Sequence, residues 1–175
     1  LCGLALGLAG CKQDELLQKN GAIYCVESSP SSMNPQLYGS GSLGSSLSHQ
    51  VYDRLLTINP QTQRLEGGLA TSWNISRDGL TYTLNLRKKV QFHHTRWFTP
   101  SRPFNADDVL FSFNRMRLER HPYHMISGGR YPSFDNSGFS QMISEIRKTA
   151  DDQVVFVLSQ PNASFLANLA SDYAV

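Results

Sequence analysis

The sequence predicts an α/β fold with a mixed sheet. Apolar and polar residues alternate between Leu80 and Phe92, which is the period of a strand with one buried face. Val109, Phe113 and Met116 recur at helical spacing. Patterns of both kinds follow one another without strict alternation, which favours α/β or α+β packing. The 175 residues suffice for one domain with a core, because 40% are hydrophobic and only 17% are charged.

The first twenty residues indicate a processed leader and a tether. Leu1 to Gly10 is almost wholly apolar or small and runs into Cys11. The letters LAGC that end at Cys11 resemble a bacterial lipobox, so we expect residues 1–10 to be a signal-peptide remnant and Cys11 to carry lipid. A membrane-spanning helix needs about 20 apolar residues, more than this segment contains. Residues 11–20 then form the lipidated cysteine and a polar tether, and residues 21–175 form the folded part.

Cys25 is the cysteine left over once Cys2 leaves with the signal peptide and Cys11 is acylated. In an oxidising compartment an odd cysteine favours a disulfide partner, here one beyond Val175, over a free thiol. Mass spectrometry of non-reduced peptides from the complete protein would show the cross-link, and a freely alkylated Cys25 would exclude it.

From residue 21 the expected elements follow in order. Gly21–Glu27 predicts a short strand, and Ser28–Gly44 predicts a loop because it is rich in Ser, Gly and Pro. A helix is expected from Leu43 to about Thr57, followed by a turn at Asn59 and Pro60. The helix depends on an apolar stripe at spacing four, formed by Leu47, Val51 and Leu55.

Two hairpins are expected farther along the chain. Trp73–Ser76 and Leu80–Phe92 predict strands joined by a turn in which Gly79 can take a positive φ. Ile143–Lys148 and Val154–Leu158 predict the second hairpin.

Two helix starts carry capping residues. Asn105 precedes Asp107 and Asp108, which places one cap side chain and two carboxylates where the amides of a helix start need acceptors. We therefore assign both carboxylates to the helix start rather than to catalysis. A last helix is expected to be capped by Asn162, with an inward face of Phe165, Leu166 and Leu169.

Candidate catalytic and cofactor motifs lack the context that they need. Gly39, Gly41 and Gly44 match G-x-G-x-x-G but follow no hydrophobic strand, so a dinucleotide site is not predicted. His93 and His94 are adjacent on an expected strand and would point to opposite faces, so they cannot chelate one metal together.

The sequence does not predict binding of a metal or of nucleic acid. His121 and His124 are separated by a proline and have no third ligand at a recognisable spacing. The net charge of +2 is small, and the basic run Arg87–Lys89 fits a solvated strand end. We expect no enzyme, no metal, no cofactor and no nucleic-acid partner.

Two glycine-containing loops have no evident role in folding. They span Met33–Gly44 and His121–Phe134, and the second holds Tyr123 and Tyr131 around Ser127–Gly129. Glycines let a backbone approach a ligand closely, so both loops could line one cleft. Ordinary surface connections would have the same composition, and the residues alone leave both interpretations open.

Four ordered motifs resemble the bacterial ABC-importer solute-binding family 5. They are IYCVESSPSSMNPQLYGSG, VYDRLL, LATSWNISRDGLTYTLNLRKKVQFH and FNADDVLFSFNR, and the similarity covers residues 21–175. HPYHMISGGRY resembles the dipeptide-binding branch, whereas HTRWFTPSRPFNADDV and RYPSFD resemble the Sap-type branch, which we favour. The chain departs from the pattern at His94, Thr95 and Arg96, where many relatives have a glycine, and this leaves the peptide class open.

The resemblance implies a two-lobe periplasmic-binding-protein type II fold with an extra subdomain. This chain would be an amino-terminal fragment that supplies the start of the first lobe and most of the subdomain. It implies a monomeric, lipid-anchored periplasmic component that captures peptides, antimicrobial peptides included, for membrane permease subunits. By motif, ligand contacts would fall on Gly39, Ser40, Gly41 and Tyr131.

Two other functions remain as alternatives. Some relatives on the same scaffold capture haem or a nickel chelate. A lipid-anchored hydrolase would need a nucleophile or a metal set, which the sequence does not display. Titration of the full-length protein with each ligand class distinguishes them.

Overall fold

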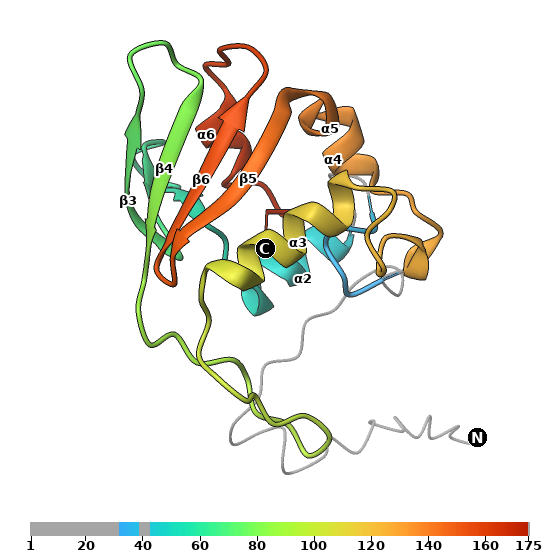
Figure 1. The fold of residues 1–175 in the computed structure, drawn as a ribbon. Coiled ribbons are helices and arrows are strands. Elements are labelled where there is room, and N and C mark those ends of the chain that lie inside the picture. Colours follow the sequence, from blue (N-terminus) through green and yellow to red (C-terminus); the bar gives the residue numbers. More distant parts are fainter. Residues whose placement is uncertain (1–31, 39–42, 175) are drawn as a thin grey trace, which may run out of the picture.

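The computed structural model describes residues 32–38 and 43–174, and its centre is a four-stranded sheet in the order β3-β4-β6-β5 (Figure 1). Helices pack with this sheet, so the α/β class is confirmed. All three neighbouring strand pairs run antiparallel, so the described part of the chain lacks the mixed parallel and antiparallel pairing that we expected. The strands are β3 Ala70–Ile75, β4 Thr81–Leu86, β5 Ile143–Ala150 and β6 Gln153–Leu158.

β4 lies between β3 and β6 and confirms the alternating pattern. Tyr82, Leu84 and Leu86 are buried, and the residues between them are half-buried. Gly79 takes φ +70° in the β3–β4 turn, as the turn type requires. The strand ends at Leu86 rather than Phe92, because its last pairing with β6 is Asn85 opposite Gln153 and the chain then leaves the sheet.

The first helix is shorter than its stripe predicts. α2 spans Leu43–Val51, and the chain then turns so that β1 (Leu56–Ile58) pairs with β2 (Leu65–Gly67). Leu55 is buried outside the helix, and its amide donates to the Ala174 carbonyl. The expected helix to Thr57 is therefore wrong, since core contacts rather than helical periodicity bury Leu55. The turn at Asn59 is confirmed by its amide, which donates to the Arg64 carbonyl at 2.9 Å.

α3 (Ala106–Arg117) covers one face of the sheet and begins as expected. Asn105 accepts from the Asp107 amide, and Asp108 accepts from the Asn105 amide, so a capping box is confirmed. Val109, Phe113 and Met116 are buried, and the ring centroids of Phe113 and Phe156 lie 5.2 Å apart. Aromatic rings continue this core, namely Phe134, Phe139, Phe156, Phe165 and Tyr173.

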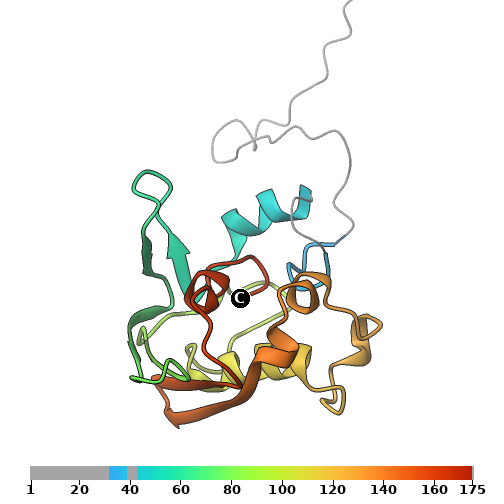
Figure 2. The same ribbon diagram turned by 90° about the horizontal axis from the view of Figure 1, so that it is seen from above.

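The end of the described chain lies in the middle of the molecule. Figure 2 shows α6 (Phe165–Asn168) and the chain end between α2 and the sheet. Phe165 and Leu169 are buried as expected. The expected cap at Asn162 is wrong, because Ser164 occupies the helix N-cap and Asn162 lies two residues before it, where its side chain accepts from the Ser164 amide.

The segment from residue 121 to residue 134 is more ordered than a loop. It contains the 3-10 helix η1 (Met125–Ser127) and enters α4 (Pro132–Asn136), which is followed by α5 (Phe139–Met142). Gly128 and Gly129 take positive φ directly after η1. Within residues 32–38 and 43–174, the helices are too short or too polar to cross a bilayer.

Replacing the α3 cap should destabilise the fold. Asn105→Ala removes the acceptor for the Asp107 amide and is expected to lower the free energy of unfolding by about 0.5–2 kcal/mol. Urea denaturation measures the change, and the exposed Asn74→Ala on β3 is the control. Equal stability of the two variants would contradict the capping role.

Candidate functional site

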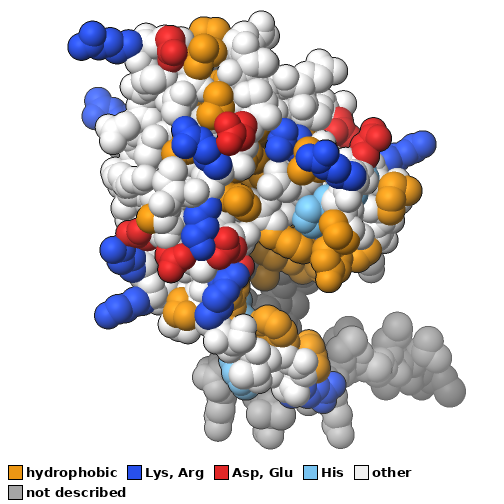
Figure 3. Space-filling model, in the orientation of Figure 1, with side chains coloured by type: hydrophobic (Ala, Val, Ile, Leu, Met, Phe, Trp, Pro, Cys, Tyr) orange, Lys and Arg blue, Asp and Glu red, His pale blue; other side chains and the backbone are white. Residues whose placement is uncertain are grey.

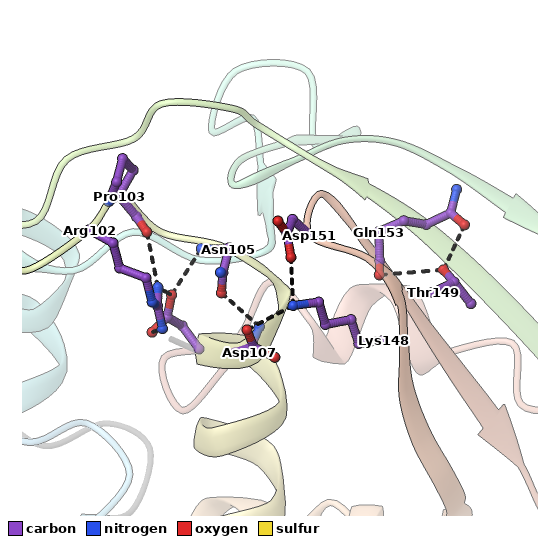
Figure 4. A network of polar contacts seen from close by, with 9 residues as sticks. Arg102, Pro103, Asn105, Asp107, Lys148, Thr149, Asp151 and Gln153 are labelled. Carbon is purple, nitrogen blue, oxygen red and sulfur yellow. Dashed lines mark hydrogen bonds and ion pairs between the residues drawn. The ribbon is translucent and has the colours of Figure 1, made fainter.

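A network of ion pairs joins the start of α3 to the β5–β6 hairpin (Figure 4). Arg102 donates two hydrogen bonds to Asp108, at 2.7 and 2.9 Å. Lys148 Nζ lies 2.8 Å from Asp107 and 2.6 Å from Asp151. The hydrogen bond from Lys148 holds the pKa of the Asp107 carboxyl below its usual value. These contacts fix the direction of α3 and of the loop that precedes it.

Three rings form an exposed patch beside the second half of α3. Phe111 stands outside the buried stripe and is 42% exposed. Its ring centroid lies 5.2 Å from that of His121 and 5.3 Å from that of Tyr123, which is 49% exposed. We call Phe111, His121 and Tyr123 the aromatic surface. Met125 and Ile126 follow closely in the sequence and are exposed as well, and Figure 3 shows hydrophobic side chains gathered on this face of the molecule.

Arg115 stands at the edge of the aromatic surface. Its guanidinium carbon lies 5.9 Å from the centroid of the Phe111 ring. It donates to Gln36 Oε1, and Gln36 Nε2 donates to the Tyr173 carbonyl at 3.3 Å. Arg115 Nε has no hydrogen-bond partner in the described part of the chain. A flat apolar patch with a cation beside it can pack a ligand's apolar groups and attract its carbonyl or carboxylate oxygens.

The two glycine-containing loops meet in the structure. Ser133 Oγ donates to the Tyr38 carbonyl at 3.0 Å. Gly39, Ser40 and Gly41 follow Tyr38 directly but lie outside the described residues, so their ligand contacts stay predictions. Cys11 and Cys25 lie outside them too, and lipidation, tether and disulfide stay predictions.

Tyr131 is placed beneath the second loop rather than on its surface. The side chain is 1% exposed, and its hydroxyl donates to the His124 carbonyl at 2.8 Å. Burial raises the pKa of this hydroxyl. The His124 ring in turn lies with Nδ1 2.7 Å from the Arg115 carbonyl. Tyr131 thus supports the segment that carries the aromatic surface, while its contact with a ligand stays a prediction.

The contact between Phe111 and His121 was not expected from the sequence. One signal was available for Phe111, because an aromatic residue two positions from Phe113 must leave the buried face of the helix. Nothing in the spacing of Phe111 and His121 could place them together, since the return of the chain after α3 depends on Tyr131 and His124 packing below it.

A cavity of about 640 Å³ adjoins a neighbouring side of α3. Asp108 and Ser112 face it from the helix, and Val51 and Tyr52 face it from the end of α2. The loop between β4 and α3, which hangs below the sheet in Figure 1, supplies much of the remaining wall. Most of the lining is apolar, with Leu55, Leu69, Val90, Phe92, Trp97, Phe98, Phe104, Val109, Phe113 and Ala174.

The histidines do not form a metal site in the described residues. There, no group of three or more His, Cys, Asp or Glu side chains is close enough to hold a metal ion. His93 and His94 lie in an irregular segment, so the strand expected to separate them is wrong, because β4 has already ended. His94 Nε2 instead lies 3.1 Å from Thr99 Oγ1.

Comparisons with known proteins agree with this architecture. A family model described as bacterial extracellular solute-binding proteins, family 5 Middle, matches residues 64–175. The dipeptide-binding protein of Escherichia coli (strain K12) is 43% identical over 98% of this chain and 32% of its own length. The peptide transport periplasmic protein SapA of Salmonella typhimurium is 44% identical over 90% of this chain and 29% of its own length.

A solved structure supports the same assignment. The dipeptide-binding protein from Pseudoalteromonas sp. SM9913, in complex with Met-Leu, matches with a TM-score of 0.83 and 47% identity. The match covers 87% of this chain and 30% of that one, so the chain spans about a third of the length of such relatives.

The chain has the fold of one part of the type II periplasmic binding proteins, which is the fold class of extracellular solute-binding proteins. Within this class the chain belongs to the bacterial extracellular solute-binding proteins, family 5. The expected resemblance is therefore confirmed at the level of the family. Identities of 43% and 44% do not separate the dipeptide-binding branch from the Sap-type branch that we favoured.

The buried hydroxyl of Tyr131 should contribute to stability. Tyr131→Phe leaves the His124 carbonyl without this donor and is expected to lower the free energy of unfolding by about 0.5–1.5 kcal/mol. Tyr123→Phe is the matched control, because that ring is half exposed. Urea denaturation decides the matter, and equal values for the two variants would show that the bond contributes nothing.

Proposed function

We propose that this protein is the substrate-binding component of an ABC importer and captures peptides in the periplasm. Membership of family 5 and the match to a relative that holds Met-Leu carry the proposal. The protein acts as a monomer that hands its ligand to membrane permease subunits, and it performs no catalysis itself.

The aromatic surface is the part of the binding site that we assign to the described chain. Peptides expose apolar side chains and carbonyl groups together, and Phe111 with Arg115 offers a partner for each. Ser133 donates to the Tyr38 carbonyl, and Gly39, Ser40 and Gly41 follow Tyr38 in the sequence, so they would supply backbone groups close to the same ligand. Closing a second lobe over this surface would shelter the hydrogen bonds from water.

Removing the central ring should weaken peptide binding. Phe111→Ala in the full-length protein is expected to cost about 1–3 kcal/mol of affinity for Met-Leu, measured by isothermal titration. Ile75→Ala, a similarly exposed apolar residue on β3, is the control. If Phe111→Ala binds like the parent, the aromatic surface lies outside the site. If the parent binds haem but no peptide, the alternative ligand class replaces the proposed one.

We further propose that the protein is held at the membrane by lipid on Cys11. The letters LAGC before a polar segment support this. Cys11→Ser should release the protein from the membrane fraction, because several acyl chains hold stably where one holds weakly. Metabolic labelling with palmitate that does not depend on Cys11 would reject the anchor.

A further inference from the structure

The 640 Å³ cavity and the aromatic surface are neighbours on α3. Asp108 and Ser112 face the cavity, and Phe111 and Arg115 face the aromatic side. Successive residues of a helix are about 100° apart, so Phe111 and Ser112 project from neighbouring sides of α3. A ligand that lies across the edge between these two sides can contact both.

The outer wall of the cavity is a tight turn with exposed aromatic rings. Thr95 and Phe98 exchange two backbone hydrogen bonds, at 3.0 and 3.4 Å. Trp97 is 76% exposed and Phe98 is 54% exposed, although both line the cavity. The Arg96 guanidinium lies 4.8 Å from the Trp97 ring centroid. So much aromatic surface at a cavity mouth favours an apolar occupant.

The wall is held in place at its base. The Phe104 amide donates to the Val90 carbonyl at 2.9 Å, and the Phe92 and Phe104 rings meet edge to face at 6.4 Å. Arg102 closes the loop onto Asp108. Thr95 Oγ1 is buried beside the cavity and has no partner in the described part of the chain. The cavity is therefore a shaped site, and its volume falls within the range of about 300–1,000 Å³ for small-molecule sites.

We propose that this cavity receives a bulky apolar side chain of the bound peptide and so selects among peptides. The inference rests on the proposed function. Most of the lining is apolar and would pack against such a side chain, while Asp53, His93 and Asp108 are the charged or titratable groups among the lining residues. Ser112 sets the depth of the cavity next to the aromatic surface, and Trp97 and Phe98 close over the side chain from outside.

The test uses the full-length protein and two dipeptides, Met-Leu and Ala-Ala. Ser112→Leu partly fills the cavity and is expected to reduce the preference for Met-Leu over Ala-Ala about tenfold, since burial of one such side chain is lost. Ser72→Leu on β3 does not line the cavity and should leave the preference unchanged. Trp97→Ala removes the outer wall and should reduce it about threefold in a protein of unaltered fold.

The outcomes separate this inference from the proposed function. A parent protein that binds neither dipeptide rejects the proposed function and the side-chain site with it. A parent that binds both, with an unchanged preference in Ser112→Leu and Trp97→Ala, rejects the side-chain site alone. A fall of several degrees in the thermal midpoint of ligand-free Trp97→Ala also overturns the side-chain site. Trp97 would then pack against another part of the complete protein, and that part rather than a ligand would cover the cavity.

Discussion

The packing of α3 across the sheet determines most of what this part of the protein can do. Phe113 meets Phe156 in the core, and Val109 and Met116 lie on the same buried side. Burying such a stripe against the sheet fixes the rotation of the helix about its own axis. Burying Phe113 therefore turns Phe111 away from the sheet, where the aromatic surface forms, while Val109 and Phe113 themselves help to line the cavity. The aromatic surface and the cavity both depend on the single orientation that α3 takes when its inner face is buried.

Ion pairs and hydrogen bonds at the start of α3 hold the helix against the elements beside it. Both acidic residues at the helix start are used, with Asp108 bound to Arg102 and the Asn105 amide, and Asp107 bound to Lys148. One set of contacts holds the loop that walls the cavity, and the other holds the β5–β6 hairpin. These groups are exposed to solvent, so their contribution is to geometry more than to stability.

The second half of the site depends on polar contacts beneath the surface. Tyr131 and His124 tie the segment after α3 back to the Arg115 carbonyl, and Gln36 joins Arg115 to the carbonyl of Tyr173. Residues distant in sequence thereby bring the two glycine-containing loops together. A largely buried network of this kind favours one arrangement, because each hydrogen bond that is lost leaves a buried polar group unpaired.

The sequence by itself determined the β3–β4 and β5–β6 hairpins, the Asn105 cap, the inward face of α3 and the family, because each depends on a local period, a turn residue or an ordered motif. Tertiary structure alone decided that Leu55 leaves the helix to enter the core and that β4 stops at Leu86, beside the first residue of the antiparallel β6. It also decided that Tyr131 is buried while Phe111 is exposed beside His121. These outcomes depend on which distant surfaces meet, and spacing along a chain carries no information about that.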